Sequence, residues 1–389
     1  MYTIKLLDRP PGSFWSKALA LNSHGHAVGF TQVDTEFQPM LWNPNPKHFS
    51  FKAQATGIND SGDVVGFFED ISHSFLIRKN GNGKPEPLIK FDSFARAINN
   101  DGFITGTFGN ILGGHPDLHA FIYNPDKQTE PIDLGVLPGD RFSQGYAINN
   151  KKQVTGLSYA HDTRAFFYDG AMMDLGPATA ANDLNDAGQV VGARDVNGLR
   201  TAFLCETSSG TPQFEDIHSM EVNGINNNGD IVGSGQGGAL VRLSGGGVQN
   251  LNSFIPNNSG WMLDSATRIN DNGQIVGLGR HNGSEQSYLL TPGSTPNFNF
   301  DRDQVVSLVF WALAWGTAGV WFGPGTPVVP IYPPPPFQDL AMRLSPEKQE
   351  MLIGIVFSEF ASLALEGRSR SELEKCALNM IRRALDQLT

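Results

Sequence analysis

The hydrophobic residues of the first 293 positions fall into short runs that recur along the chain, with polar turns between them. The recurring pattern reads A-x-(A/G)-I-N-x-x-G-x-V-V-G, in which an apolar run ends at an asparagine and a β-branched run follows a short polar turn. The seven anchoring asparagines are Asn22, Asn59, Asn99, Asn149, Asn185, Asn226 and Asn270. Their regular spacing indicates seven copies of one structural unit of roughly forty residues.

Two glycine positions indicate how each copy turns. The residue three after the asparagine is glycine in six copies and Lys152 in the fourth. A short hairpin loop needs a positive φ there, which glycine adopts without steric cost, and the asparagine can bond its own backbone. The residue seven after the asparagine is glycine in every copy: Gly29, Gly66, Gly106, Gly156, Gly192, Gly233 and Gly277. We expect this second glycine to end the strand, where a Cβ would collide with a neighbouring backbone.

Two further apolar segments follow in each copy, such as His119–Tyr123 and then Pro131–Gly135 in the third. Four short strands per copy are the content of a propeller blade. The seventh copy lacks its fourth strand, and Tyr2–Leu7 resembles the missing segment. A strand from the N-terminus would remove the exposed edges that an open array leaves. We therefore predict an all-β fold over residues 1–293, a seven-bladed β-propeller closed by the N-terminal strand, rather than a solenoid or β-helix.

The last 96 residues have a different composition. Residues 294–338 contain an apolar stretch, Val305–Phe322, and then a proline-rich segment that is incompatible with a helix. Residues 339–389 predict an α-helical hairpin, because Ser345–Pro346 and Ser371-x-x-Glu374 are helix-start signals. We interpret the large aromatic residues as partner-binding anchors: Trp311, Trp315, Trp321 and Phe322. Eighteen apolar residues could also just span a bilayer, so membrane contact is the second interpretation.

Composition excludes several functional classes. The net charge is −11 and no run of Lys or Arg stands out, so nucleic acid is not an expected partner. Two cysteines without a C-x-x-C pair give neither a disulfide framework nor a zinc site, and they are expected to be small buried groups. No catalytic motif or cofactor-binding motif occurs, so no catalytic residue, cofactor or metal is predicted. The absence of a secretory signal favours a cytoplasmic protein, with export or membrane association as alternatives.

Two sets of polar residues suggest a ligand but have a simpler interpretation. His73, His119 and Arg164 lead the third segment in successive copies, which predicts either a ligand or metal patch on one arc of the ring or ordinary repeat chemistry. The other copies have Gln, Thr or Gly there, which favours repeat chemistry. The Asn/Asp-rich turns lack the alternating ligands and the distant Glu of a calcium loop, and hairpin chemistry explains them.

The columns I-N-x-x-G-x-V-V-G, H-A-F-L/I-W/Y and D-L-G-x-L-P-G resemble those of the HAF-repeat family, often described as probable extracellular repeat proteins of bacteria. The resemblance covers residues 1 to about 293 and leaves the tail unmatched. It implies a β-propeller-like repeat domain, often exported, and no particular chemistry. Only His73 and His119 keep the leading histidine of the second column.

These observations favour a non-enzymatic protein-binding or assembly scaffold. The propeller would be a rigid recognition ring, and the tail would mediate oligomerisation or dock a protein partner. One alternative is an enzyme that acts on a glycan or small metabolite at the propeller mouth. Another alternative is a propeller anchored in a membrane through its tail.

Overall fold

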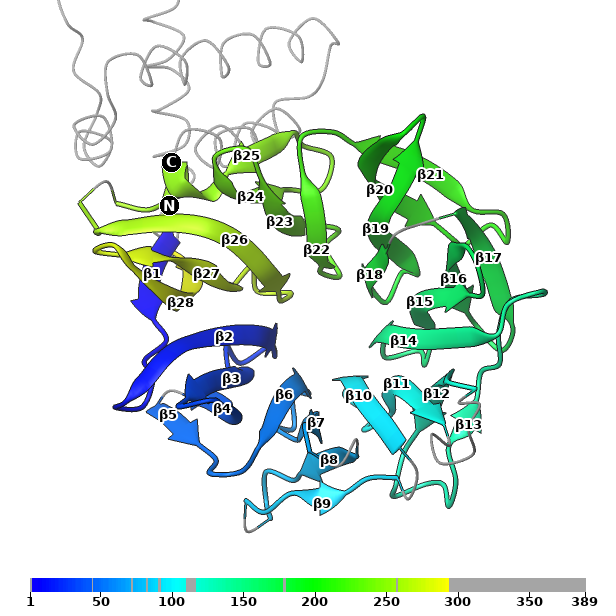
Figure 1. Ribbon diagram of the computed structural model, residues 1–389. Helices are drawn as coiled ribbons and strands as arrows, with labels where there is room; N and C mark the ends of the chain where they lie inside the picture. Colours follow the sequence, from blue (N-terminus) through cyan, green and yellow to red (C-terminus); the bar gives the residue numbers. More distant parts are fainter. Residues whose placement is uncertain are drawn as a thin grey trace, which may run out of the picture. The chain divides into compact units, whose positions relative to one another are not determined.

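Each repeat of the sequence folds into one antiparallel sheet of four strands in the computed structural model (Figure 1). The structure describes residues 2–43, 45–70, 73–81, 83–89, 92–109, 117–177, 180–256 and 258–293. The chain divides into two units, Met1–Gly293 and Ser294–Thr389, and every described residue belongs to the first. The predicted linker segment and helical hairpin, together with Cys376, lie outside the described residues.

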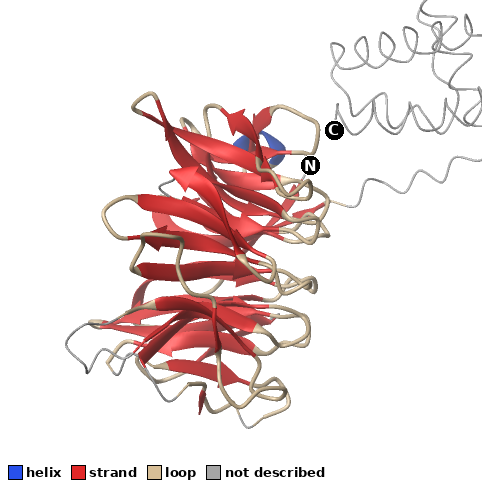
Figure 2. Cartoon of the chain, turned by 90° about the vertical axis from the view of Figure 1, so that its right-hand side faces the viewer, coloured by secondary structure: helices blue, strands red, loops and turns tan. Residues whose placement is uncertain are grey.

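The first two strands of each sheet form the hairpin that carries the repeated asparagine. The innermost strands are β2 (Ser13–Leu21), β6 (Ala53–Ile58), β10 (Asp92–Ile98), β14 (Phe142–Ile148), β18 (Ala180–Leu184), β22 (Glu221–Ile225) and β26 (Trp261–Ile269). The second strands are β3 (Ala27–Val33), β7 (Val64–Phe68), β11 (Ile104–Gly109), β15 (Val154–Tyr159), β19 (Gln189–Val196), β23 (Ile231–Gly235) and β27 (Ile275–His281). Figure 2 shows the ring from the side, with turns and loops at the two ends of the strands.

The outer half of each blade consists of the third and fourth strands. The third strands are β4 (Glu36–Asn43), β8 (Ser74–Ile77), β12 (His119–Tyr123), β16 (Thr163–Tyr168), β20 (Leu199–Glu206), β24 (Gly238–Arg242) and β28 (Ser284–Pro292). The fourth strands are β5 (Asn45–His48), β9 (Glu86–Pro87), β13 (Ile132–Asp133), β17 (Met172–Pro177), β21 (Gln213–Ile217), β25 (Val248–Asn250) and, in the last blade, β1 (Tyr2–Leu6). The predicted seven-bladed, all-β propeller is confirmed.

The N-terminal strand closes the ring. β1 pairs antiparallel with β28, with Tyr2 opposite Pro292 and Leu6 opposite Tyr288. Leu7 then enters a hydrophobic cluster that joins the seventh blade to the first, beside Met40 and Trp42. The closing strand is thus bound by backbone hydrogen bonds to the last blade and by apolar contacts to the first.

The invariant second glycine does not end its strand, which corrects the expectation from the sequence. Gly66 lies inside β7, opposite Ala55, and the register of the inner strand shifts between Ala55 and Gly57. This β-bulge turns the carbonyl oxygen of Gln54 toward Gly66, so that a Cβ on Gly66 would overlap it. The expected reason for the glycine, a close approach of neighbouring backbone, is confirmed. The expected position of the glycine at the end of the strand is wrong.

The third strand places a large buried side chain opposite the same glycine. Phe75 pairs with Gly66 and Phe121 with Gly106, and both aromatic side chains are completely buried. In the seventh blade Tyr288 pairs with Gly277 and is also completely buried. The phenylalanine column and the glycine column of the sequence are therefore two halves of one packing arrangement within each blade.

Hydrophobic clusters lie at the seams between neighbouring blades. Each cluster contains residues from two successive blades. For example, Val28 of β3 in the first blade packs with Ala55, Val64 and Phe75 of the second blade. The blades therefore share cores with their neighbours, which couples their stabilities. Cys205 is one of these buried residues, and burial raises the pKa of its thiol to about 11.

Helices contribute little to the described residues, where a 3₁₀ turn at Leu251–Phe254 follows β25. Within that part of the chain, no helix has the length and apolar character needed to cross a membrane.

Deletion of residues 1–8 should destabilise the propeller severely. The deletion removes β1 and Leu7, exposes the edge of β28 and opens the seam between the seventh and first blades. We expect aggregation or a Tm lower by about 10 °C or more in thermal unfolding. The control is Thr3→Ala, an exposed position on the same strand, which should leave the Tm nearly unchanged. A truncated protein with the Tm of the full chain would contradict closure by the N-terminal strand.

Gly66→Ala should destabilise the protein by about 3 kcal/mol, because the new methyl group meets the Gln54 carbonyl and lies 2.7 Å from Phe75 Cζ. The matched control is Gly247→Ala, because no atom lies within 4 Å of a Cβ there. Chemical denaturation of both variants provides the comparison. Equal stabilities for the two variants would show that close approach at Gly66 is unimportant.

Candidate functional site

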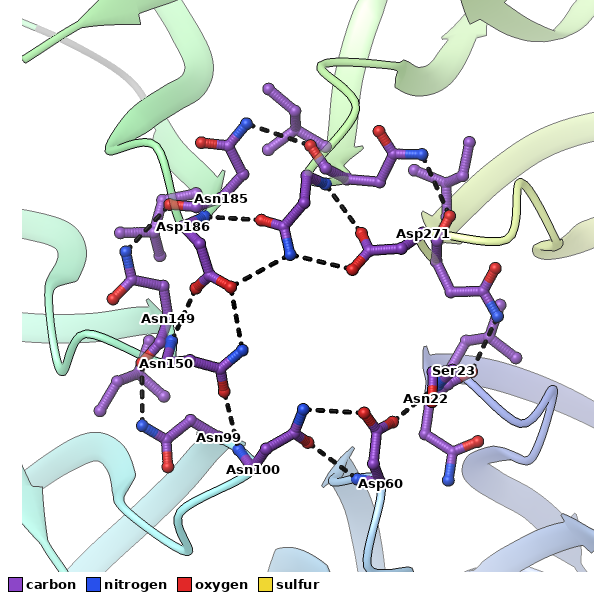
Figure 3. Close-up of a pocket in the computed structure, with 18 of the residues that line it drawn as sticks. Asn22, Ser23, Asp60, Asn99, Asn100, Asn149, Asn150, Asn185, Asp186 and Asp271 are labelled. Atoms are coloured by element: carbon purple, nitrogen blue, oxygen red, sulfur yellow. Dashed lines mark hydrogen bonds between the residues drawn. The ribbon is translucent and has the colours of Figure 1, made fainter.

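The inner strands of all seven blades end around one cavity of about 180 Å³ on the axis of the ring. We call it the axial cavity. Each inner strand contributes the apolar residue that ends the strand, and most also contribute the asparagine and the residue that follows it. The site is therefore built from the most regular part of the sequence repeat, the turn between the first and second strands (Figure 3).

The seven repeated asparagines form a closed ring of hydrogen bonds. In each blade the asparagine Nδ2 donates to the backbone carbonyl oxygen of the asparagine in the next blade, over 2.8 to 3.3 Å. The last of these bonds runs from Asn270 to Asn22 and so crosses the seam between the chain's last and first blades. All seven residues are buried. The ring is thus a continuous link between blades at the level of the turns.

The same asparagines also stabilise their own turns, as the sequence predicted. Asn99 Oδ1 accepts the backbone N–H groups of Asp101 and Phe103, and Asn149 Oδ1 accepts those of Lys151 and Gln153. The fourth turn keeps this geometry although Lys152 replaces glycine, and it does so at a positive φ of 65°. One amide side chain therefore satisfies two N–H groups in its own blade and one carbonyl in the next.

The residue after each asparagine builds a second ring: Ser23, Asp60, Asn100, Asn150, Asp186, Asn227 and Asp271. Six backbone N–H groups donate to the side-chain oxygen of the following blade, over 2.7 to 3.0 Å. Ser23 stands where the seventh acceptor would be, and its side chain is shorter than those of its counterparts. The second ring therefore has a different composition at the seam between the seventh and first blades.

Three carboxylates, Asp60, Asp186 and Asp271, face the axial cavity (Figure 3). Each accepts hydrogen bonds on both oxygens, and Asp186 Oδ2 accepts from Asn150 and Asn227 at 3.0 and 3.1 Å. Asp60 and Asp271 thus each accept two hydrogen bonds within the ring and Asp186 accepts three, of the roughly four that a carboxylate can accept. Among the described residues no group of three or more His, Cys, Asp or Glu side chains is placed to hold a metal ion.

One residue of each inner strand bulges out three positions before the asparagine: Leu19, Thr56, Arg96, Tyr146, Asn182, Asn223 and Thr267. Thr56 donates to the carbonyl oxygen of Ala95 in the next blade at 2.8 Å, and Asn223 donates to that of Ala266 at 2.9 Å. Arg96 instead lies over the ring of Tyr146, with 5.3 Å between guanidinium and ring centroid. Several bulge residues thus also link neighbouring blades, by contacts that vary around the ring.

An ion pair joins the fifth and seventh blades across the sixth. Asp183 Oδ2 lies 3.9 Å from Arg268 Nε and accepts the backbone N–H of Ile225 at 3.1 Å. Burial raises the pKa of Asp183, and the charge of Arg268 and two backbone N–H groups oppose this rise. The equivalent residue of the sixth blade is Gly224, where a Cβ would lie 3.3 Å from the Asp183 carboxylate. The glycine therefore leaves the space that the ion pair needs.

A family model described as "Protein of unknown function (DUF3466)" matches residues 11–295. The chain belongs to this family. No curated protein matches the sequence. The DUF3466 match begins within the first blade and spans the repeats, so the family corresponds to the propeller described above.

Several solved structures are similar to this DUF3466 chain. The β-propeller domain of Myceliophteria thermophila Cps50 (Swd1) has 9% identity and a TM-score of 0.49, and covers 75% of this chain and 100% of that one. A streptogramin B lyase has 13% identity and a TM-score of 0.48, with coverages of 75% and 98%. YCF48 bound to D1 peptide has 9% identity and a TM-score of 0.44, with coverages of 75% and 95%. At these scores the similarities support no inference about activity or ligand.

The structure places the three residues of the predicted patch near the start of third strands: His73 directly before β8, His119 first in β12 and Arg164 second in β16. His119 Nδ1 lies 2.8 Å from Asp133 Oδ2 on the neighbouring fourth strand. Arg164 pairs with Asp174 of its own blade and with Asp140. His73 directly precedes β8, and its backbone carbonyl accepts the N–H of Phe68. His119 and Arg164 thus each engage a nearby carboxylate, and the patch stays a prediction.

The predicted partner-binding anchors Trp311, Trp315, Trp321 and Phe322 lie outside the described residues. The sequence analysis did not predict that the ring of asparagines and the second ring around the axial cavity form a site. The available signal was the residue after each asparagine, which is Asp or Asn in six copies and Ser in one. A side chain that only shaped its own hairpin would not need an amide or carboxylate in that position.

Asn99→Ala should destabilise the propeller by about 3 kcal/mol. The substitution leaves the Asn149 carbonyl and two turn N–H groups without their buried partner. Asn99→Asp keeps the acceptor for the turn but loses the donor to the next blade, so most of the loss should persist. Asp101→Ala, an exposed change in the same turn, is the control and should stay within about 0.5 kcal/mol of the parent protein. An Asn99→Asp variant as stable as the parent would contradict the link between blades.

Proposed function

We propose that this DUF3466 protein is a non-enzymatic binding scaffold, in which the propeller is a rigid recognition ring. The observation that carries the proposal is the use of the repeated polar residues. The asparagines and the residues after them hold neighbouring blades together, and their hydrogen-bonding groups are largely satisfied by each other. A site whose polar groups already bind one another is suited to rigidity rather than to chemistry.

The C-terminal region supplies the second half of the proposal. Trp311, Trp315, Trp321 and Phe322 are proposed to anchor a protein partner or a second copy of the chain, because large aromatic residues dominate interface energetics. The matching family model is DUF3466, and the resemblance to HAF-repeat proteins stays a prediction. The cytoplasmic location expected from the N-terminal sequence stays a prediction, as does the alternative of a membrane-anchored propeller.

An enzyme that acts on a glycan or small metabolite at the axial cavity is the second candidate. It is favoured by the three carboxylates that gather there, Asp60, Asp186 and Asp271. General acid–base catalysis needs a carboxyl group within reach of a substrate proton. Here the carboxylate oxygens accept hydrogen bonds from neighbouring blades, so the scaffold accounts for them more directly.

The full-length chain, purified without detergent, should be a soluble oligomer, whereas a version ending at Pro292 should be monomeric. Truncation at Pro292 keeps all seven blades and the closing strand, so the propeller itself should stay folded. Light scattering coupled to size exclusion gives both masses. The quadruple change of Trp311, Trp315, Trp321 and Phe322 to Ala in the full chain should also give a monomer.

Other outcomes would change the assignment. If only the full-length chain needs detergent, the aromatic segment belongs to a membrane anchor. If the full-length chain and the version ending at Pro292 are both monomers, the tail does not mediate self-association, and the proposal then requires a separate protein partner. Loss of folding in the truncated version would show that the tail supports the propeller instead of recruiting partners.

A further inference from the structure

A cavity of about 240 Å³ lies between the first and second blades. The first blade contributes Leu41 and Lys47, and Phe49 follows β5. The second blade contributes the apolar residues Val64 and Ile77. The cavity therefore has apolar side chains beside polar surface, and its charged lining residues are all basic: Lys47, Arg78 and Lys79.

Two of the three basic side chains have no described counter-charge. Arg78 forms a two-pronged ion pair with Asp126 of the third blade, at 2.7 and 2.9 Å, so its charge is neutralised. Lys47 and Lys79 form no ion pair with any carboxylate of the described residues. Lys47 Nζ lies instead 4.9 Å from the centroid of the Phe49 ring. Both lysines are exposed, so their ammonium groups are accessible to an anion at the cavity.

The surroundings of Lys79 contain a histidine and a carboxylate. Burial lowers the pKa of His26 in the adjoining turn of the first blade, and His24 and Lys79 lower it further. The backbone N–H of Lys79 donates to Asp63 at 3.0 Å, but the Asp63 carboxylate forms no ion pair with the ammonium group. The ammonium group of Lys79 therefore has no ion pair with a described carboxylate, although Asp63 binds the backbone of the same residue.

Equivalent positions of the fifth and sixth blades provide an internal comparison. Lys47 pairs with Leu41 across β4 and β5, and Glu215 pairs with Leu204 across β20 and β21 at the corresponding place. Glu215 forms an ion pair of 2.5 Å with Arg242 of the next blade. Between the fifth and sixth blades, the protein thus supplies both charges itself.

Among the described residues, the seam between the first and second blades has no ion pair at these two positions. Lys47 replaces the glutamate, and the residue equivalent to Arg242 is Ile77, which pairs with Val64 as Arg242 pairs with Ile231. The protein therefore supplies a cation and an apolar wall where the other seam has a complete ion pair. A carboxylate with an apolar body would pair with Lys47 and pack against this wall.

We propose that the cavity between the first and second blades binds a small organic carboxylate. The carboxylate pairs with Lys47 and Lys79, and the apolar body packs against Leu41, Phe49 and Ile77. The cavity holds about eight water volumes at roughly 30 Å³ each, below the roughly 300–1,000 Å³ of drug-sized pockets. An aromatic acid of the size of benzoate fits this volume. The proposal is independent of the scaffold function.

The test is isothermal titration calorimetry of the full-length protein with benzoate, its neutral analogue benzamide, and inorganic phosphate. Benzoate should bind saturably, with benzamide and phosphate each at least about tenfold weaker. Lys47→Glu copies the residue at Glu215, and Lys79→Ser copies Ser244, whose backbone N–H makes the same contact with Asp230. Both variants should keep the parent Tm and weaken benzoate binding about tenfold or more. The matched control Lys151→Ser removes an exposed charge from another blade and should leave binding unchanged.

Several results would overturn the proposal. Equal binding of benzamide would show that the lysine charges are not used, and equal binding of phosphate would show that the apolar walls are not used. Absence of benzoate binding would refute the site directly. Unchanged benzoate affinity in Lys79→Ser would do so even if Lys47→Glu failed to fold.

Discussion

The hydrogen bond from each repeated asparagine to the backbone of the next blade is the constraint on which the rest of the ring depends. Asparagine is suited to this place because its oxygen can accept two turn N–H groups while its nitrogen donates to a carbonyl. Aspartate lacks the donor, and serine is too short to serve both partners. The bond between Asn270 and Asn22 joins residues 248 positions apart, and only a closed ring can form it. Closure at this level complements closure by β1 at the outer edge of the last blade.

The strands, the number of blades and the closing strand could be predicted because seven copies of one pattern report on the same local geometry. The contacts between blades could not, since six of the seven asparagine partners lie 36 to 50 residues away, the seventh lies 248 away, and the direction of each depends on the curvature of the ring. The second glycine illustrates this limit. The sequence indicated that no side chain fits at this glycine. It did not reveal the bulge beside it, which adds only one residue to an apolar run such as Ala53–Ile58. A pattern of apolar positions does not distinguish that residue from its neighbours.

The candidate ligand residues show the same division between local and distant information. The repeat identified His73, His119 and Arg164 as equivalent, and the structure adds the nearby carboxylates of His119 and Arg164, such as Asp133 and Asp174. The axial carboxylates went unnoticed because Asp60, Asp186 and Asp271 are separated by two or more blades and look like ordinary turn residues. Only the ring brings them to one cavity.

Differences between copies are informative here because the copies share a backbone. A residue present in all seven blades answers a need that all seven share, as the asparagines and second glycines do. A residue that departs from its column while its backbone pairing is unchanged answers a local need. Arg242 is the one charged residue in a column that otherwise contains Trp42, Ile77, Tyr123, Tyr168, Cys205 and Leu290, and it forms the ion pair with Glu215. The column of Glu215 varies in charge as well, with Lys47 in the first blade, Glu86 in the second and Lys5 in the seventh. Recognition in this propeller is therefore expected at seams between blades, where the repeat is free to vary, more than at the axis, where the hydrogen-bonding groups already bind one another.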